Sequence, residues 1–199
     1  TAVTGLITGE AKQSTVTNNI ANANTNGFKS DNLSIKSFDD VLIQNYDKIV
    51  NGKNTKNIIG SLSEGSKIDD TNTDFTQGVL ATTDKATDFA IDGKGFFTVQ
   101  RDNGITTKNY YTRTGDFHID GSGYLVTESG DKVLGKDKVT NAIKPIFVGD
   151  GKLQVDNSGN ISVNGVNRYK FDTVDFKDYK SIKKVGDNLF DGEIGRASC

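Results

Sequence analysis

The chain has 199 residues, of which 34% are hydrophobic, and its mean hydropathy of −0.50 suits an elongated molecule better than a compact globule. Its 24 basic and 26 acidic residues are interspersed and give a net charge of −2, which excludes the basic face of a nucleic-acid-binding protein. Cys199 is the single cysteine, so an intrachain disulfide is excluded, and no apolar run approaches the length of a membrane span.

Residues 2–23 are predicted to form an amphipathic helix. Small or apolar residues recur at intervals of three and four, the spacing of a heptad seam, with one polar interruption: Ala2, Leu6, Gly9, Gln13, Val16, Ile20 and Ala23. Gly9 and Gln13 weaken this seam, and a short helix with so narrow a stripe is marginal alone in water. The helix therefore needs a partner, which is either a second helix or the rest of its own domain. The pair Asn26-Gly27 is predicted to end it, because glycine adopts the left-handed cap conformation without strain.

The next fifty residues are polar and poorly periodic, and we expect an extended connecting region over residues 29–80. Within it, the stretch SFDDVLIQNYDKIV at residues 37–50 is predicted to form a short helix, with Val41, Leu42, Tyr46 and Ile49 on one side. The following NGKNTKN is a loop by composition.

From Asp88 onward the pattern predicts antiparallel β structure. Alternating apolar residues flank glycine-rich turns in DFAIDGKGFFTVQ, FHIDGSGYLV and LQVDNSGNISV. The segment that starts at Asp120 matches the segment that starts at Asp156 almost position for position, so the same turn is expected twice. The expected core draws on alternate apolar positions: Phe89, Ile91, Phe97, Val99, Phe117, Ile119 and Leu125. The predicted fold class is therefore mainly β, a hairpin-rich antiparallel β domain with an N-terminal heptad α-helix, α + β overall.

Candidate catalytic and metal-binding motifs are weak. The GKG and GSG pairs lie in hairpins with no helix behind them to bind a phosphate. Asp116, His118 and Asp120 imitate the start of a calcium loop, but Thr127 stands where such a loop needs a bidentate glutamate. One histidine, one cysteine and no nucleophile elbow leave no catalytic constellation. We expect no enzyme, no cofactor, no metal ion and no small-molecule substrate.

Several motifs in the expected order resemble the bacterial flagellar rod and hook protein family. The segment NNIANANTNGFK (residues 18–29) is similar to the N-terminal signature of that family. The segments DFTQG, TDFAIDGKGFFTVQ and YYTRTGDFHIDGSGYLVTESGDKVLG resemble its middle signatures, and GDNLFDG resembles the segment before its C-terminal helix. The long insertion typical of hook subunits is absent, which favours a rod protein; proximal and distal rod both stay open.

Departures from the family pattern indicate a chain shortened at both ends. Thr8-Gly9-Glu10 stands where the family carries Gly-Met, and the expected C-terminal helix is missing. The predicted organisation is a partial inner-tube helix at 1–28, the connecting region at 29–80, a β-rich outer domain at 81–192 and a truncated tail at 193–199, its end set aside as vector-derived.

The resemblance implies a structural subunit of the flagellar basal-body rod, which self-assembles into a helical tube and transmits torque from motor to hook. It implies as partners other copies of the chain, other rod and hook subunits and the flagellar type III export apparatus, and as location the basal body in the cell envelope. The expected assembly residues combine the apolar stripe with the amide-rich signature: Leu6, Val16, Asn19, Ile20, Asn22, Asn24, Thr25, Gly27 and Phe28. The alternative is a calcium- or glycan-binding β module of an extracellular surface protein. A cell-wall hydrolase would need a catalytic acid pair, and none is distinctive.

Overall fold

The computed structural model describes residues 2–39, 41–50, 53–62 and 65–192. Contacts along the chain divide it into two units: unit 1 holds Thr1–Ala23 and Ser30–Phe75, and unit 2 holds Asn24–Lys29 and Thr76–Cys199. The short segment after the helix therefore belongs with the β domain, whereas the following hairpins belong with the helix. The predicted boundaries at residues 28 and 80 stay predictions. No helix in the described residues has the length and hydropathy of a membrane span.

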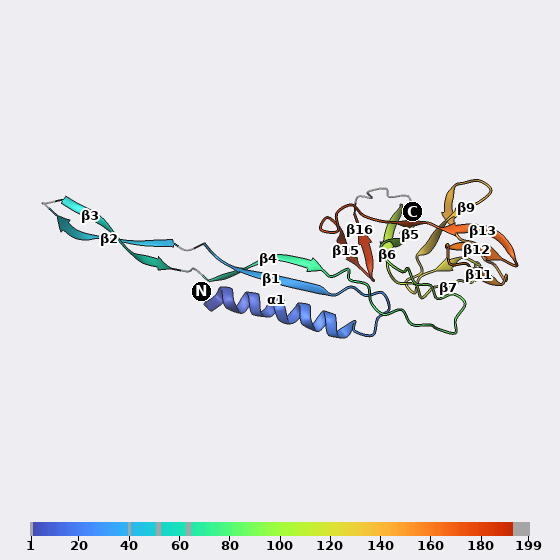
Figure 1. Ribbon diagram of the computed structural model, residues 1–199, viewed down its shortest axis with the longest axis horizontal. Coiled ribbons are helices and arrows are strands. Elements are labelled where there is room, and N and C mark those ends of the chain that lie inside the picture. The colour runs from blue at the N-terminus through green and yellow to red at the C-terminus, as the bar shows by residue number, and fades with distance from the viewer. Residues whose placement is uncertain (1, 40, 51–52, 63–64, 193–199) are drawn as a thin grey trace. The chain divides into compact units, whose positions relative to one another are not determined.

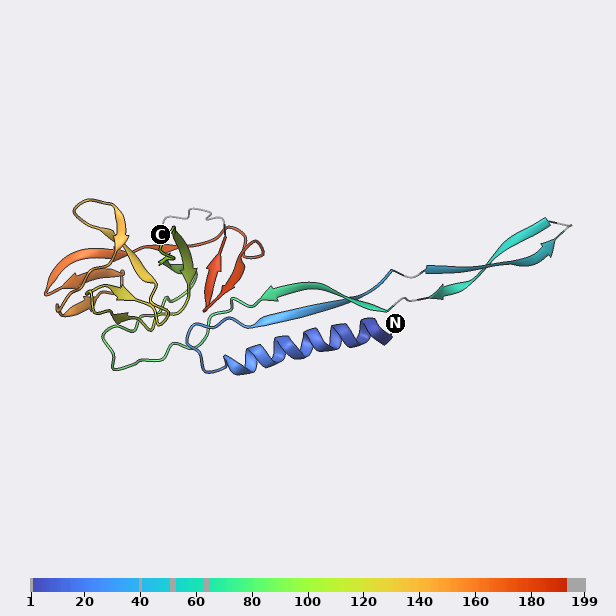
Figure 2. The ribbon, with the colours of Figure 1, turned by 180° about the vertical axis from the view of Figure 1, so that it is seen from behind.

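Unit 1 begins with α1 (Ala2–Ala21), which lies alongside β1 (Asp31–Ser37) and β4 (Ser66–Thr73) in both views of the molecule (Figure 1, Figure 2). The helix ends at Ala21, so the prediction that Asn26-Gly27 ends it is wrong. At this end Asn22 Nδ2 donates to the Asn18 carbonyl (2.9 Å), so an asparagine side chain competes there with the helical backbone for a hydrogen bond.

The paired strands β1 and β4 of unit 1 are connected by a second pair of antiparallel strands, β2 (Val41–Val50) and β3 (Lys53–Leu62). The predicted helix over residues 37–50 is therefore wrong. The spacing of its apolar residues is compatible with a helix, but its β-branched and aromatic residues favour a strand when a partner strand is available. The register of this ribbon shifts twice, and β1–β4 shifts once between Ser34 and Ile35.

Unit 2 is one antiparallel sheet, which confirms the predicted fold class. Its path runs β11-β12-β13-β9-β5-β6-β16-β15. These strands are β11 (Leu153–Val155), β12 (Asn160–Val163), β13 (Val166–Phe171), β9 (Lys132–Asp137), β5 (Phe96–Asp102), β6 (Thr107–Thr112), β16 (Leu189–Asp191) and β15 (Lys183–Gly186). Four short strands pair off this path: β7 (His118–Ile119), β8 (Leu125–Val126), β10 (Ile143–Pro145) and β14 (Thr173–Val174).

The hydrophobic core among the described residues lies in this sheet. The seven predicted core positions all belong to it: four are buried, and Phe89, Ile91 and Ile119 pack against the cluster while half-buried. The segment with Phe89 and Ile91, predicted to be the first strand of a hairpin, does not form a strand, however. Phe89 instead donates its amide to the Gly115 carbonyl (2.8 Å), because Gly115 has no side chain and lets the two backbones approach closely.

The repeated turn forms twice, as predicted. Asp120 Oδ1 accepts the amides of Ser122 (2.9 Å) and Tyr124 (2.8 Å) between β7 and β8. Asp156 Oδ1 accepts the amides of Ser158 (2.9 Å) and Asn160 (2.8 Å) between β11 and β12. In each turn a glycine with positive φ donates back to the aspartate carbonyl at 2.9 Å. The same residue types at the same spacing therefore build the same hydrogen bonds.

Candidate assembly interface

The apolar stripe of α1 faces away from its own hairpin. Leu6, Val16 and Ile20 have 73%, 46% and 69% of their surface exposed, and Val3 and Ile7 beside them are exposed as well. The helix packs on β1 and β4 through a different row of residues, which lies roughly on the opposite side of the helix from the apolar stripe. Its members recur at intervals of four and three and are Thr4, Thr8, Ala11, Thr15, Asn19 and Asn22. Of the two partners that the pattern allowed, the structure shows the helix packed on its own unit, though not through the heptad seam. A second helix as partner of the seam stays a prediction.

Polar contacts hold the packed face. The Thr8 hydroxyl lies 3.1 Å from the Ser66 hydroxyl and also within hydrogen-bond distance of the Thr4 and Gly5 carbonyls. Asn19 Nδ2 donates to the Asp31 carbonyl (2.8 Å), and Asn19 Oδ1 accepts the Asp31 amide (3.1 Å). These bonds position the helix but bury no large apolar side chain, so they add little hydrophobic stabilisation.

The amides of the signature act largely within the chain. Asn19 binds β1 as described, and Asn22 Nδ2 donates to the Asn18 carbonyl (2.9 Å) at the helix end. Asn24 is exposed beyond the helix. These amides are among the expected assembly residues; for Asn19 and Asn22 the structure shows backbone partners in the same chain.

Residues 25–28 form a tight turn that belongs to unit 2. The Phe28 amide donates to the Thr25 carbonyl (3.3 Å), and Gly27 at the third turn position has a φ of +68°. A Cβ on Gly27 would lie 2.6 Å from the Arg113 carbonyl, so glycine is required both by φ and by close approach. Gly27 therefore allows a turn that packs against the Arg113 backbone, and it does not cap the helix.

Lysines from distant parts of the chain fix this turn. Lys184 Nζ lies 4.2 Å from the centroid of the Phe28 ring and donates to the Lys29 carbonyl (2.8 Å). Lys29 is itself buried and donates from Nζ to the Thr76 carbonyl (2.8 Å). Sequence reasoning missed Lys184 and Arg113 as partners of the signature, because no local pattern links residues so far apart in the chain.

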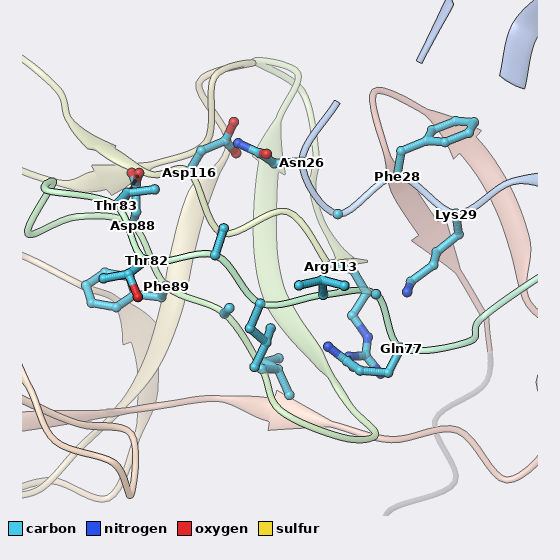
Figure 3. A pocket seen from close by; sticks show the side chains of 18 residues that line it. Asn26, Phe28, Lys29, Gln77, Thr82, Thr83, Asp88, Phe89, Arg113 and Asp116 are labelled. Atoms are coloured by element: carbon cyan, nitrogen blue, oxygen red, sulfur yellow. Dashed lines mark hydrogen bonds between the residues drawn. The ribbon is translucent and has the colours of Figure 1, made fainter. Parts of the chain in front are cut away.

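A cleft of about 390 Å³ opens beside the turn (Figure 3). Thr83, Asp88 and Phe89 lie on one side of the view, and Lys29, Gln77 and Arg113 lie on the other. Burial raises the pKa of the Asp116 carboxyl above its ordinary value, and the negative charges of Glu128 and Asp88 raise it further. Burial lowers the pKa of Arg113, whose guanidinium donates to the Gly93 carbonyl (2.8 Å).

The calcium reading finds no support in the loop that suggested it. Asp120 Oδ1 already accepts two backbone amides, and the Thr127 hydroxyl accepts the Asp131 amide (3.1 Å) where a calcium loop would place a carboxylate. Within the described ranges no cluster of three histidine, cysteine or acidic side chains could hold a metal ion. His118 is exposed on β7.

These features define a class of protein: a structural subunit, with a β domain that has its own core and a helix whose apolar seam its own unit does not cover. Comparison with known proteins gives the family. Residues 1–29 match the model of the flagella basal body rod protein, and residues 90–164 match that of the flagellar hook protein FlgE/F/G D1 domain.

Individual relatives agree with both matches. The flagellar basal-body rod protein FlgG of Buchnera aphidicola subsp. Schizaphis graminum is 31% identical over 94% of this chain and 70% of its own length. FlgG of Borreliella burgdorferi is 30% identical over 98% of this chain and 73% of its own length. The flagellar hook protein FlgE of Helicobacter mustelae is 37% identical, but over 64% of this chain and only 28% of its own length.

The chain therefore belongs to the flagellar basal-body rod and hook protein family. It is a structural protein of the flagellar basal body and not an enzyme, and it interacts with other flagellar subunits. The alternative of a calcium- or glycan-binding surface module is not supported.

Proposed function

We propose that this chain is a rod subunit that is exported into the cell envelope by the flagellar type III export apparatus and polymerises into a helical tube that transmits torque. The apolar seam of α1 makes the contact with neighbouring subunits, and the β domain forms the outer part. Rod rather than hook is favoured because the rod proteins align over most of their own length, whereas the hook protein aligns over a small part of its length.

The observation that carries this proposal is the distribution of buried apolar side chains. Among the described residues, every buried hydrophobic side chain belongs to unit 2, from Phe96 to Phe190. Among the described side chains of unit 1, nine large apolar ones are exposed: Val3, Leu6, Ile7, Val16, Ile20, Ile35, Ile43, Leu62 and Ile68. A helix and two-stranded ribbons are marginal in water when, as in the described part of unit 1, they bury no large apolar side chain. A surface that covers unit 1 should therefore stabilise it.

Substitution of Leu6, Val16 and Ile20 by aspartate tests the proposal in the natural host. Each buried aliphatic side chain contributes roughly 1.5–3 kcal/mol, and a stripe of like charge adds repulsion, so subunit contacts through α1 should be lost. The cells should export the variant and build no rod. The melting temperature of unit 2 should stay within a few degrees of the parent, because the substituted positions are distant from its core.

A matched control places aspartate at Lys12, Ser14 and Asn18, three exposed polar positions of the same helix. This control should still build rods. Normal rods with the Leu6, Val16 and Ile20 variant would overturn the assignment of the contact to the seam. Failure of both variants would show a general effect of charge on the helix.

A further inference from the structure

The loop between β9 and β10 projects from unit 2 (Figure 1, Figure 2). Asp137 organises it: Oδ1 accepts the amides of Val139 (2.7 Å) and Thr140 (3.0 Å), and the Asp137 amide donates to the Ala142 carbonyl (2.9 Å). Lys144 forms an ion pair with the same carboxylate. A loop held this firmly loses little conformational entropy when it binds a partner.

The tip of this loop is apolar, and positively charged side chains surround the strands from which it projects. Val139 at the tip is 91% exposed, and Ile143 at the foot of the loop is 57% exposed. Four cations surround the base on two neighbouring strands and the loop: Lys136, Lys138, Arg168 and Lys170. Lys136 lies directly opposite Lys170 in the β9–β13 register, and the Lys138 amide donates to the Arg168 carbonyl (2.9 Å).

Like charges placed opposite one another destabilise a strand pair. In the described part of the chain, Lys136, Arg168 and Lys170 form no ion pair that would offset this repulsion. An anionic surface on a partner would relieve it. A bound partner would also cover Val139, whose exposure costs hydrophobic stabilisation in the isolated chain.

A surface of complementary shape and charge exists on the same unit. The cleft of about 390 Å³ is concave where the loop is convex, and apolar side chains line it beside Asp88 and Asp116. Glu128 is close enough to Asp116 to raise the pKa of its carboxyl. The cations at the far side of the cleft are used internally, since Lys29 binds the Thr76 carbonyl and Arg113 binds the Gly93 carbonyl.

We propose that the β9–β10 loop of one copy inserts into the cleft of a second copy, with Val139 against the apolar lining and Lys136 and Lys138 facing Asp88 and Asp116. The loop and the cleft are different surfaces of one unit, so the contact is heterologous and repeats from copy to copy. This inference rests on the proposed rod function and deepens it: it identifies a contact between β domains in addition to the contact through α1.

Cysteine cross-linking in cells tests the pairing. A chain with Val139→Cys and Ala81→Cys, in a Cys199→Ser background, should give a ladder of covalent oligomers with a short bis-maleimide, because Ala81 lines the cleft. Each single cysteine variant should give monomer alone. The matched control is Ile105→Cys with Ala81→Cys, since Ile105 is 93% exposed at a different hairpin tip and should give no ladder.

Charge variants then test the chemistry of the contact. Lys136→Glu with Lys138→Glu should abolish the ladder, and adding Asp88→Lys should restore part of it. Lys183→Glu, an exposed lysine on β15, should leave the ladder unchanged.

Three results would overturn the inference: a ladder from the Ile105 pair equal to that from the Val139 pair, no ladder in cells with normal rods, or a ladder that survives the two lysine substitutions. The second result would leave the proposed rod function intact. Normal rods with the Leu6, Val16 and Ile20 variant would instead count against the rod contact through α1.

Discussion

At the scale of single residues, Gly27 and Asp116 show what the fold demands of particular positions. Gly27 combines a positive φ with backbone contact to Arg113, and no other residue type meets both conditions. Asp116 lies half-buried near two other carboxyl groups, where its charged form is disfavoured. Each position gives a prediction about the stability of unit 2.

Gly27→Ala should destabilise unit 2 more than Gly93→Ala. Both glycines have positive φ, but a Cβ at Gly93 meets no atom within 4 Å, whereas a Cβ at Gly27 meets the Arg113 backbone at 2.6 Å. A strained non-glycine residue costs of order 1–3 kcal/mol, and the overlap at Gly27 adds to that cost. Denaturant unfolding of the two variants measures the difference. Equal losses would show that the turn is not docked on Arg113 in solution.

Asp116→Asn should raise the melting temperature at pH 7 and have little effect at pH 3. The folded-state pKa of Asp116 is raised, so its favourable contribution is present below the unfolded pKa, about 3.9, and is lost as the pH rises through the folded pKa. The gain from asparagine should therefore grow with pH across this window. Asp69→Asn removes a charge from an exposed strand and is the control. A gain independent of pH would contradict the assignment to Asp116.

At the scale of elements, the turn at Asp120 and the turn at Asp156 are two copies of one design. In each, a single carboxylate oxygen accepts two backbone amides and a glycine closes the turn. The hairpins β7–β8 and β11–β12 therefore depend on one side chain each for their register.

Asp156→Ala should lower the melting temperature of unit 2, and Asp156→Asn should lower it less, because the amide oxygen can still accept hydrogen bonds. The hydrogen bonds from Asn160 hold the pKa of the Asp156 carboxyl below its ordinary value, so its stabilisation is present at neutral pH and is lost as the pH falls through the folded pKa. Thermal melts at pH 7 and at pH 2 test both statements. A Ser158→Ala control removes a side chain of the same turn and leaves the Asp156 carboxylate and its backbone donors in place.

At the scale of the whole molecule, the two units differ in what stabilises them. Unit 2 has a core of aliphatic and aromatic side chains, whereas unit 1 relies on polar contacts such as Thr8–Ser66 and Asn19–Asp31. Under the proposed function, folding and assembly would use different apolar surfaces of one chain: the core of unit 2 and the seam of α1.

Hydrogen exchange should separate the units in the unassembled protein. Amides of α1, β1 and β4 should exchange much faster than those of β5, β6 and β9, because local opening is easy where few apolar contacts are buried. Assembly into rods should slow exchange in α1 selectively. Equal protection in both units of the unassembled chain would mean that unit 1 is stable without partners.

The sequence by itself determined the class of fold, the heptad stripe on the first helix and the repeated hairpin turns. These depend on spacing over a few residues, which sets periodicity and turn geometry directly. The family followed from signatures in the expected order. The short helix predicted at residues 37–50 failed because strand pairing with residues 53–62 overrode local propensity.

Only the tertiary structure decided which face of α1 packs and where the signature turn docks. A helix with one polar row of threonines and asparagines and one apolar stripe can pack through either, and the choice depends on hydrogen-bond partners such as Ser66 and Asp31 far along the chain. The contacts of Phe28 and Lys29 with Lys184 likewise join residues more than 150 positions apart. Such pairings depend on the three-dimensional path of the backbone, so local spacing could not predict them.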